Sequence, residues 1–256
     1  MFTNKNHGFT LAEVLITLAI IGIVAAMTIP TLVGNAQKTQ YITGLKKAYA
    51  ETTEALKLMA SDYGCPDDLS CTGLFGNSAT SDTFANEFKK YFKLAKDCGS
   101  TYDVNDEKTK CFADTYTSHI DGTFSGLSFP QDFMGSYTLT TADGFSMAIT
   151  DDADNCAAGF NAAPGTNMAH TCAQVLIDVN GQKGPNTLGR DLFYFLITTG
   201  KGPALYPRGG QEVVTQGEAW TDPSGNPIKC TEGPNQAAVG FYCTARVMEQ
   251  GWQMNY

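Results

Sequence analysis

The feature that most constrains this chain is a long uncharged segment that begins next to a carboxylate. Residues 14–37 carry no charged side chain, and Glu13 stands immediately before them. About 20 predominantly apolar residues are enough for a helix to span a bilayer. A carboxylate costs roughly 2.5 to 3.5 kcal/mol at the centre of a bilayer. Glu13 therefore either lies at the water edge of the segment or has a partner that offsets this cost.

The first eight residues, MFTNKNHG, are polar and contain a lysine but no acidic residue. A positive leader before an apolar run favours a cytoplasmic leader, with the rest of the chain directed outward. Two ordinary interpretations fit this arrangement. One is a signal peptide with a weak cleavage signal at Gly34-Asn35-Ala36, and the other is a plain transmembrane anchor. The charge of Glu13 and an apolar core longer than the usual run of about 7 to 15 residues disfavour the signal peptide.

The stretch Gly8-Phe9-Thr10-Leu11-Ala12-Glu13, followed by the apolar run, resembles the prepilin signature of type IV pilins and type II secretion pseudopilins. The resemblance is strong over residues 1–60 and extends only to architecture beyond them. It implies that a prepilin peptidase cleaves after Gly8 and that Phe9 becomes N-methylated. It also implies that Pro30 bends the helix, as a proline does in many members of the family.

The same resemblance implies partners, a location and a domain organisation. The partners are the prepilin peptidase, other pilin or pseudopilin subunits, the assembly platform, and the membrane before assembly. The location is the bacterial inner membrane, crossed once with the head outside the cytoplasm, and then a pilus or pseudopilus in the periplasm or on the cell surface. The expected parts are a leader at 1–8, a transmembrane and filament-core helix at 9–36, its amphipathic continuation at 37–60, and a globular head at 61–256.

Glu13 has a physical role in such an assembly. Cleavage before Phe9 frees an α-amine with a pKa of about 8, which is largely protonated at neutral pH. The Phe9 amine of one subunit can pair with Glu13 of its neighbour, and a misaligned subunit would leave a buried charge without its partner. We therefore interpret Glu13 as an assembly residue. Pro30 removes a helical hydrogen bond, so we interpret it as a bend or a locally melted site, with a helix end at Ile29 as the alternative.

Beyond Lys38 the pattern becomes that of an amphipathic helix. Apolar or small side chains recur every three or four residues, at Tyr41, Leu45, Ala48, Tyr49, Thr52, Leu56 and Met59. Asp62, Gly64 and Pro66 then predict the end of the helix. One long helix, apolar all round in its first half and amphipathic in its second, predicts a lollipop whose second half packs on a globular head.

The remaining pattern predicts an α+β head, a pilin-like antiparallel sheet that packs on the long helix and is stapled by disulfides. Residues 84–95 place Phe84, Phe88, Phe92 and Ala95 on one face and predict a short second helix. The alternating residues on either side of Asp143-Gly144 predict a hairpin with a tight turn.

Two further runs, 174–179 and 192–197, predict strands, and the second is apolar enough to be central in the sheet. Three or four strands are therefore expected. From Thr199 onward glycine, proline and threonine dominate, which predicts an extended loop held by Cys230 and Cys243.

Eight cysteines behind a membrane-targeting segment indicate disulfides formed in an oxidising compartment. None forms a C-x-x-C pair, which disfavours a zinc ribbon or a thioredoxin-like site. We favour pairing between nearest neighbours, although eight cysteines allow about 105 connectivities and the sequence does not choose among them. The candidate pairs are Cys65 with Cys71, Cys98 with Cys111, Cys156 with Cys172, and Cys230 with Cys243.

One loop of the head carries oxygen-bearing side chains in a pattern that Ca²⁺ coordination uses. Its candidate ligands are Asp178, Asn180, Gln182 and Asp191. The spacing does not match an EF-hand, because a glycine follows Asn180 directly and no glutamate closes the loop. Some secretion pseudopilins bind calcium in their C-terminal loops, which favours calcium by analogy. The alternative is a turn in which the Asp and Asn side chains bond their own backbone. A second acidic run, Asp151, Asp152 and Asp154, is interpreted as a solvated turn.

Familiar catalytic motifs are missing from the sequence. It contains no HExxH, no G-x-S-x-G elbow, no phosphate-binding P-loop and no strand-linked GxGxxG. The net charge of -9 gives no support to nucleic-acid binding. We therefore predict a structural subunit, not an enzyme, that polymerises through its N-terminal helix into a type IV pilus or a type II secretion pseudopilus. The alternatives are a minor tip subunit for adhesion and, in another class, a secreted or membrane-anchored enzyme with an ordinary signal.

Overall fold

The computed structural model describes residues 9–75, 81–100, 110–117, 125–128, 136–151, 154–157, 166–209 and 239–256. The chain divides into two compact units, Met1–Gln40 and Tyr41–Tyr256, and each is described by itself. Helix α1, Leu11–Asp62, contributes its first part to the N-terminal unit and its remaining residues to the C-terminal unit.

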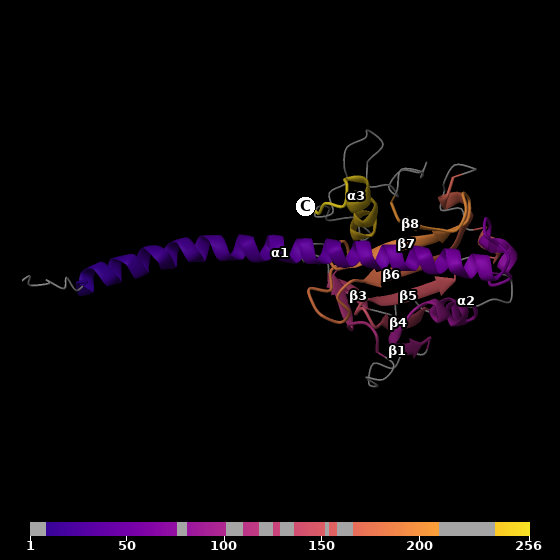
Figure 1. Ribbon diagram of the computed structural model, residues 1–256, viewed down its shortest axis with the longest axis horizontal. Helices are drawn as coiled ribbons and strands as arrows, with labels where there is room; N and C mark the ends of the chain where they lie inside the picture. The colour runs from indigo at the N-terminus through magenta and orange to yellow at the C-terminus, as the bar shows by residue number, and fades with distance from the viewer. Residues whose placement is uncertain are drawn as a thin grey trace, which may run out of the picture. The chain divides into compact units, whose positions relative to one another are not determined.

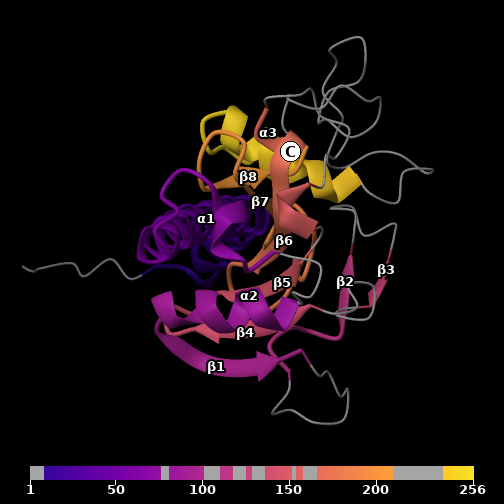
Figure 2. The same cartoon turned by 90° about the vertical axis from the view of Figure 1, so that its right-hand side faces the viewer.

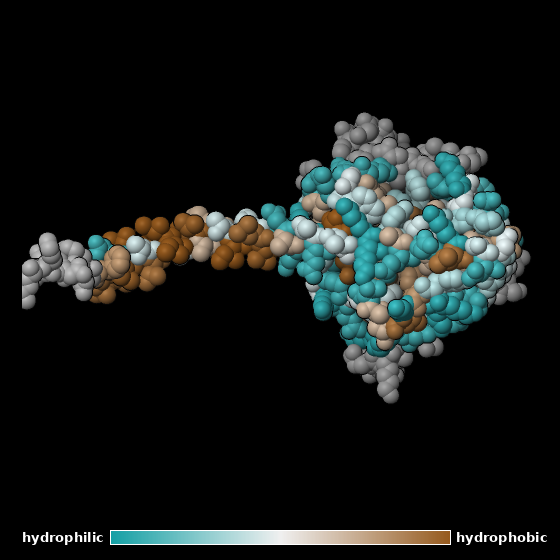
Figure 3. All heavy atoms as spheres, in the orientation of Figure 1, coloured by the Kyte–Doolittle hydropathy of each residue, from teal (hydrophilic) through white to brown (hydrophobic). Residues whose placement is uncertain are grey.

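The N-terminal unit consists of the apolar part of α1. Its large hydrophobic side chains are exposed from Leu11 to Val33, and they dominate the surface of this part of the helix (Figure 3). By length and composition the helix is able to cross a membrane. It continues through Pro30 without interruption, so the alternative of a helix end at Ile29 is wrong.

In the C-terminal unit, α1 buries one face. The buried residues are Tyr41, Ile42, Leu45, Ala48, Thr52, Ala55, Leu56, Met59 and Ala60. They follow the three- and four-residue spacing predicted for this helix, and Tyr49, which was placed on the same face, is half-buried. The helix ends at Asp62 as expected, and Gly64 adopts a φ of +69°, the left-handed conformation typical of a residue that follows a helix.

This face of α1 packs against an antiparallel sheet, which has six strands in the described part of the chain (Figures 1 and 2). Its strands, in spatial order, are β1 (Leu94–Gly99), β4 (Tyr137–Thr141), β5 (Ser146–Asp151), β6 (Thr171–Asp178), β7 (Leu192–Thr198) and β8 (Ala204–Pro207). Every residue of β7 is buried, as expected for an apolar interior strand. At the edges, β1 pairs with β4 through two register shifts, and β8 ends on a proline. The α+β fold, with a long helix on an antiparallel sheet, is confirmed.

The sheet has a hydrophobic core on each face. On the α1 side, Leu45, Leu56 and Phe195 belong to one cluster. On the opposite side lies the hairpin of β2 (Thr115–Thr117) and β3 (Ser125–Ser128), where Tyr116 packs with side chains of β6 and β7 (Figure 2). The sheet is therefore covered on both sides, which explains why its inner strands lack the alternation of a half-exposed strand.

The helix predicted for residues 84–95 is wrong in its second half. Helix α2, Ser81–Phe88, is followed by a short 3₁₀ helix, Lys89–Tyr91, and β1 begins at Leu94. The helical spacing of the phenylalanines instead supports an aromatic cluster, in which the ring of Phe88 lies 5.1 Å from the rings of both Phe84 and Phe92. The backbone after Phe92 obtains its hydrogen bonds from β4.

The C-terminal region also differs from the prediction. An extended loop was expected from Thr199 onward, but the described residues after it include β8 and helix α3, Cys243–Glu249. Residues 210–238 of the predicted loop lie outside the described residues. With β1 and β8, the described residues form six strands in the sheet, where three or four were expected. The side chain of Thr244 anchors α3, because its Oγ1 accepts a hydrogen bond from the backbone N–H of Tyr194 at 2.8 Å.

Three of the expected disulfides are present, Cys65–Cys71, Cys98–Cys111 and Cys156–Cys172. Cys243 is also disulfide-bonded, whereas Cys230 lies outside the described residues. Each of the three closes a short loop, and loops of this size are typically worth about 2 to 4 kcal/mol. The disulfides therefore hold the end of α1, the start of the β1–β2 connection and the β5–β6 connection.

Candidate assembly site

The residues that carry the predicted assembly role stand at the start of α1. Phe9 is 88% exposed, and Gly8 lies outside the described residues. The carboxylate of Glu13 accepts two hydrogen bonds of 2.8 Å from Thr10, one from its backbone N–H and one from its hydroxyl. The hydroxyl of Thr10 in turn accepts a hydrogen bond from the backbone N–H of Glu13 at 3.2 Å.

This reciprocal arrangement is a capping box, in which Thr10 is the N-cap and Glu13 the third helical residue. It satisfies donors at the helix start that would otherwise lack partners. The Thr-x-x-Glu spacing that produces it was visible in the sequence, yet the carboxylate was interpreted only as a partner for the Phe9 amine. Within one chain, Glu13 thus already has two donors, and an incoming amine would compete with Thr10 for this carboxylate.

The hydroxyl groups of the apolar segment are also satisfied inside the helix. Thr17 donates to the backbone carbonyl of Val14 at 2.9 Å, and Thr28 donates to that of Val24 at 2.9 Å. The hydroxyl of Thr31, next to Pro30, donates to the backbone carbonyl of Thr28 at 2.8 Å. Such bonds let threonine occupy an apolar environment, because each hydroxyl already has a hydrogen-bond acceptor inside the helix and needs none from water.

The predicted calcium residues belong to the connection between β6 and β7, and the structure brings together only some of them. Asp178 and Asp191 are both fully buried. Asp178 accepts a hydrogen bond from the hydroxyl of Tyr116 at 2.6 Å and one from the backbone N–H of Asn180 at 3.1 Å. Gln182 is exposed and donates instead to the backbone carbonyl of Lys110 at 2.8 Å.

Asp191 organises the loop through backbone donors, the N–H groups of Asn186 at 2.8 Å and Thr187 at 2.6 Å. Burial, and then the nearby charge of Asp191, raise the pKa of Asp178 well above its usual value. Burial likewise raises the pKa of Asp191. Two carboxylates in this setting oppose each other's ionisation, so a bound cation would relieve a real electrostatic cost.

Two amide oxygens of the same loop have no hydrogen-bond donor among the described residues. They are the Oδ1 atoms of Asn180 and Asn186, and both are shielded from solvent. Among the described residues, no group of three or more His, Cys, Asp or Glu is placed to hold a metal ion. A calcium ion here would therefore depend on these amide oxygens as well as on Asp178 and Asp191, and Asn186 fits such a site better than the predicted Gln182.

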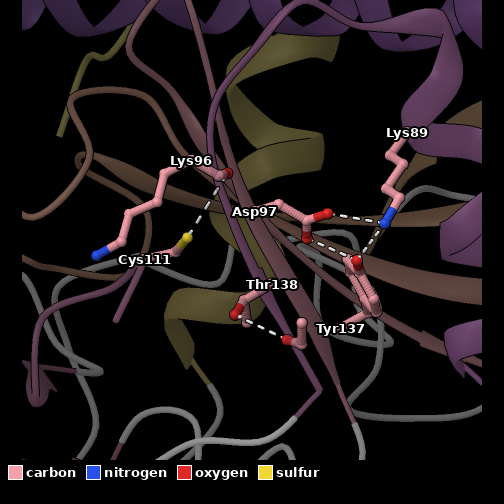
Figure 4. A network of polar contacts seen from close by, with 7 residues as sticks. Lys89, Lys96, Asp97, Cys111, Tyr137 and Thr138 are labelled. Carbon is pink, nitrogen blue, oxygen red and sulfur yellow. Dashed lines mark hydrogen bonds and ion pairs between the residues drawn. The ribbon is translucent and has the colours of Figure 1, made fainter. Parts of the chain in front are cut away.

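A polar cluster that the sequence did not suggest joins the segment after α2 to the sheet (Figure 4). Lys89 Nζ donates to Asp97 at 2.7 Å and to the hydroxyl of Tyr137 at 2.6 Å, and Tyr137 donates to the other oxygen of Asp97 at 2.6 Å. Burial alone would raise the pKa of Asp97, but the hydrogen bonds from Lys89 and Tyr137 lower it below its usual value. The lysine and the carboxylate are thus held in their charged forms, which suits a structural ion pair and not a nucleophile.

Comparison with known proteins bears on the start of α1. Residues 3–29 match the family described as "Prokaryotic N-terminal methylation motif". Over 36 residues the chain is 44% identical to the type II secretion system core protein G of Escherichia coli (strain K12). The start of the chain thus carries a prepilin-type methylation motif and is similar to a type II secretion pseudopilin. The match covers 14% of this chain and 25% of that pseudopilin's length, and no solved structure matches the chain. The matched motif thus contains Phe9, Thr10 and Glu13, and it does not extend into the head. The head is therefore interpreted from its own residues.

Proposed function

We propose that this pilin-type chain is a structural subunit that polymerises through α1 into a type IV pilus or a type II secretion pseudopilus after its leader is removed. The observation that carries the proposal is Glu13 at the start of the uncharged, exposed apolar segment of α1, inside a matching N-terminal methylation motif. Exposed apolar surface on this scale needs a membrane or other helices to cover it.

The mechanism follows from the hydrogen bonds of Glu13. Cleavage after Gly8 makes Phe9 the first residue and gives it a charged amine. In the membrane, Thr10 shares its donors with the Glu13 carboxylate and lowers the cost of keeping that charge. In the filament, the amine of a neighbouring subunit replaces or joins Thr10 at Glu13 and sets the axial register, because an offset subunit would leave a buried charge unpaired.

The location and partners follow from this role. Before assembly, residues 9–36 lie in the bacterial inner membrane with the head outside the cytoplasm. The prepilin peptidase, the assembly platform and other pilin or pseudopilin subunits are then the partners. The disulfides support a head that folds in an oxidising compartment. A minor tip subunit with an adhesive head is the alternative within the same proposal.

Mass spectrometry of the mature N-terminus tests the proposal against the enzyme alternative. The expected result is a chain that starts with N-methylated Phe9. A chain that starts at Gln37, after the weak signal-peptide site, would remove α1's apolar segment and overturn the proposal. Deleting the prepilin peptidase of the host should leave the leader attached, whereas inhibition of ordinary signal peptidase should have no effect on it.

We also propose that the β6–β7 connection binds calcium, with Asp178, Asp191, Asn180 and Asn186 as the residues that hold it. The oxygens of Asn180 and Asn186, which are buried and have no donor within the described part of the chain, and the two buried carboxylates of the same connection support this. Calcium at about 100 times its dissociation constant should stabilise the head by about 2.7 kcal/mol. The melting temperature should therefore rise by about 5 to 10 °C over the chelator-treated protein.

Thermal unfolding in EDTA and in excess Ca²⁺ measures this effect. The Asp191→Asn variant should lose the calcium-dependent shift. Asp143→Asn, which alters an exposed carboxylate in the β4–β5 turn, should keep it. Equal melting temperatures in the two solutions would show that Asp178 and Asp191 serve only to organise the turn.

A further inference from the structure

A distant segment of the head contacts the β6–β7 connection, which carries the proposed calcium residues. The segment consists of residues 110–117, and we call it the clasp. It ends in β2, on the face of the sheet opposite α1 (Figure 2). Phe112 and Tyr116 of the clasp are buried in the same hydrophobic cluster as Leu188 of the connection. The clasp and the connection therefore share one core, although they lie far apart in the sequence.

Thr117, at the end of the clasp, pairs with the backbone of the connection. Its N–H donates to the carbonyl of Asn186 at 2.9 Å, and its own carbonyl accepts a hydrogen bond from the N–H of Leu188 at 2.9 Å. The hydroxyls of Thr117 and Thr187 lie 2.7 Å apart. These contacts form a parallel β-bridge between the two threonines. One residue of the clasp thus holds three consecutive residues of the connection.

Two side-chain hydrogen bonds fasten the first part of the connection to the clasp. The hydroxyl of Tyr116 donates to the carboxylate of Asp178 at 2.6 Å. Nε2 of Gln182 donates to the backbone carbonyl of Lys110 at 2.8 Å. Gln182 was predicted as a calcium ligand, but its side-chain amide bonds the clasp. We therefore interpret Gln182 as a residue that positions the connection.

The residues that the clasp holds are the proposed calcium ligands or lie close to them. Asp178 is itself bonded by the clasp, and Asn186 provides the carbonyl that pairs with Thr117. Asn180 lies two residues before Gln182. The amide oxygens that lack a described donor, on Asn180 and Asn186, are thus placed by backbone that the clasp anchors. A loop that is ordered in advance binds an ion more tightly, because binding then requires less loss of conformational freedom.

The start of the clasp is held separately, by the edge strand β1. Cys111 forms a disulfide with Cys98 of β1, and Nζ of Lys96 donates to the carbonyl of Lys110 at 2.7 Å. Figure 4 shows Cys111 beside Lys96. The start of the clasp therefore stays tethered to the sheet even if the connection changes conformation. The bonds at its other end, around Thr117, exist only while the connection keeps the conformation described here.

The carboxylates of the connection oppose this conformation when no cation is bound. Asp178 and Asp191 are both fully buried, and burial without a counter-charge disfavours the ionised form of a carboxylate. Opening the connection would hydrate both groups, whereas a bound cation would compensate their charge. The docked and released forms of the clasp therefore differ in their affinity for a cation, which is the condition for coupling.

We propose that docking of the clasp and calcium binding are coupled, so that the ion favours the docked clasp and its removal releases the end of the clasp from the connection. The proposal rests on the calcium site proposed above. Because such coupling is reciprocal, the clasp raises the affinity for calcium by the same factor by which calcium favours docking. The position of β2, and with it the surface on that side of the sheet, then depends on calcium.

Hydrogen–deuterium exchange of the full chain, measured by mass spectrometry in excess Ca²⁺ and in EDTA, tests the coupling. We expect peptides that cover residues 110–117 and residues 178–191 to exchange about tenfold or more slowly with Ca²⁺. At exchange times of seconds to minutes, peptides that cover residues 137–151 should stay protected in both solutions. This β4–β5 control distinguishes release of the clasp from unfolding of the whole head.

Two single variants weaken the clasp without altering the four proposed ligands. Thr117→Val keeps the shape of the side chain but removes its hydroxyl, and Gln182→Ala removes the amide that bonds Lys110. Each is expected to raise the dissociation constant for Ca²⁺ about fivefold, the effect of one hydrogen bond, as measured by isothermal titration calorimetry. The matched control is Thr138→Val, which removes a hydroxyl bonded to the carbonyl of Gly99 between β4 and β1. It should bind calcium as the wild type does.

The contrary outcomes separate the clasp from the calcium site. Slower exchange in residues 178–191 alone would overturn the coupling and leave the calcium site intact. Unchanged exchange and an unchanged melting temperature with Ca²⁺ would overturn the calcium site and the clasp together. Wild-type affinity in both Thr117→Val and Gln182→Ala would refute the coupling. Loss of all binding in Gln182→Ala, with none of the weakening in Thr117→Val, would also refute it and would make Gln182 an ion ligand.

Discussion

Replacing Glu13 with alanine is expected to leave removal of the leader largely intact and to reduce incorporation into filaments by roughly a hundredfold or more. The reason is that the Phe9 amine of the neighbouring subunit would then be buried without a partner, which typically costs about 3 to 5 kcal/mol. Quantitative immunoblotting of sheared filaments against total mature protein measures the effect.

Two variants make this result specific. Glu54→Ala removes an exposed carboxylate of the same helix and should incorporate normally. Thr10→Val breaks the capping box but keeps the carboxylate, so it should cost only about 1 kcal/mol, roughly a fivefold change. If Thr10→Val were as severe as Glu13→Ala, helix capping and not pairing with the amine would be the main role of Glu13.

Replacing Gly189 with alanine is expected to destabilise the head by about 2 to 6 kcal/mol. Gly189 has a φ of +83°, and a Cβ placed there would lie 2.6 Å from Cβ and 2.7 Å from Sγ of Cys243. A left-handed non-glycine residue costs about 1 to 3 kcal/mol, and forcing α3 away from the loop adds about 1 to 3 kcal/mol. Urea unfolding of the purified chain, followed by near-ultraviolet circular dichroism, measures the loss.

Gly202 offers a control that separates the two costs. Its φ is +89°, but an added Cβ would meet no atom within 4 Å. Gly202→Ala should therefore cost only the conformational strain, about 1 to 2 kcal/mol. Equal losses for the two variants would mean that the close approach of Gly189 to Cys243 does not matter for the stability of the head.

The elements that the sequence predicted well are those whose signal is local. The buried face of α1 repeats over several turns, and the turn at Asp143-Gly144 has a strong residue preference, as the observed β4–β5 hairpin confirms. In β7 a continuous apolar run marks an interior strand. None of these depends on which distant segment lies alongside.

The elements that were missed depend on tertiary contacts. Residues of β1 continued the helical spacing of the phenylalanines, and only pairing with β4 makes them a strand. Helix α3 is too short to form alone, and its place is set by Thr244 and by the space that Gly189 leaves for Cys243. At the candidate site, the pilin-type motif was readable in the sequence, whereas the polar cluster of Lys89, Asp97 and Tyr137 unites residues that no sequence pattern connects.

The two edge strands of the sheet have a consequence for the proposed filament, in which many copies of the head would lie close together. An exposed edge strand presents unpaired backbone N–H and C=O groups, and neighbouring identical domains tend to pair their edge strands with each other. Here β1 is interrupted by register shifts, and β8 ends on Pro207, which has no N–H to donate. The register shifts of β1 and the proline of β8 both disfavour pairing between the edge strands of two heads. In the proposed filament, subunits would then join through their helices, and neighbouring heads would stay separate from one another.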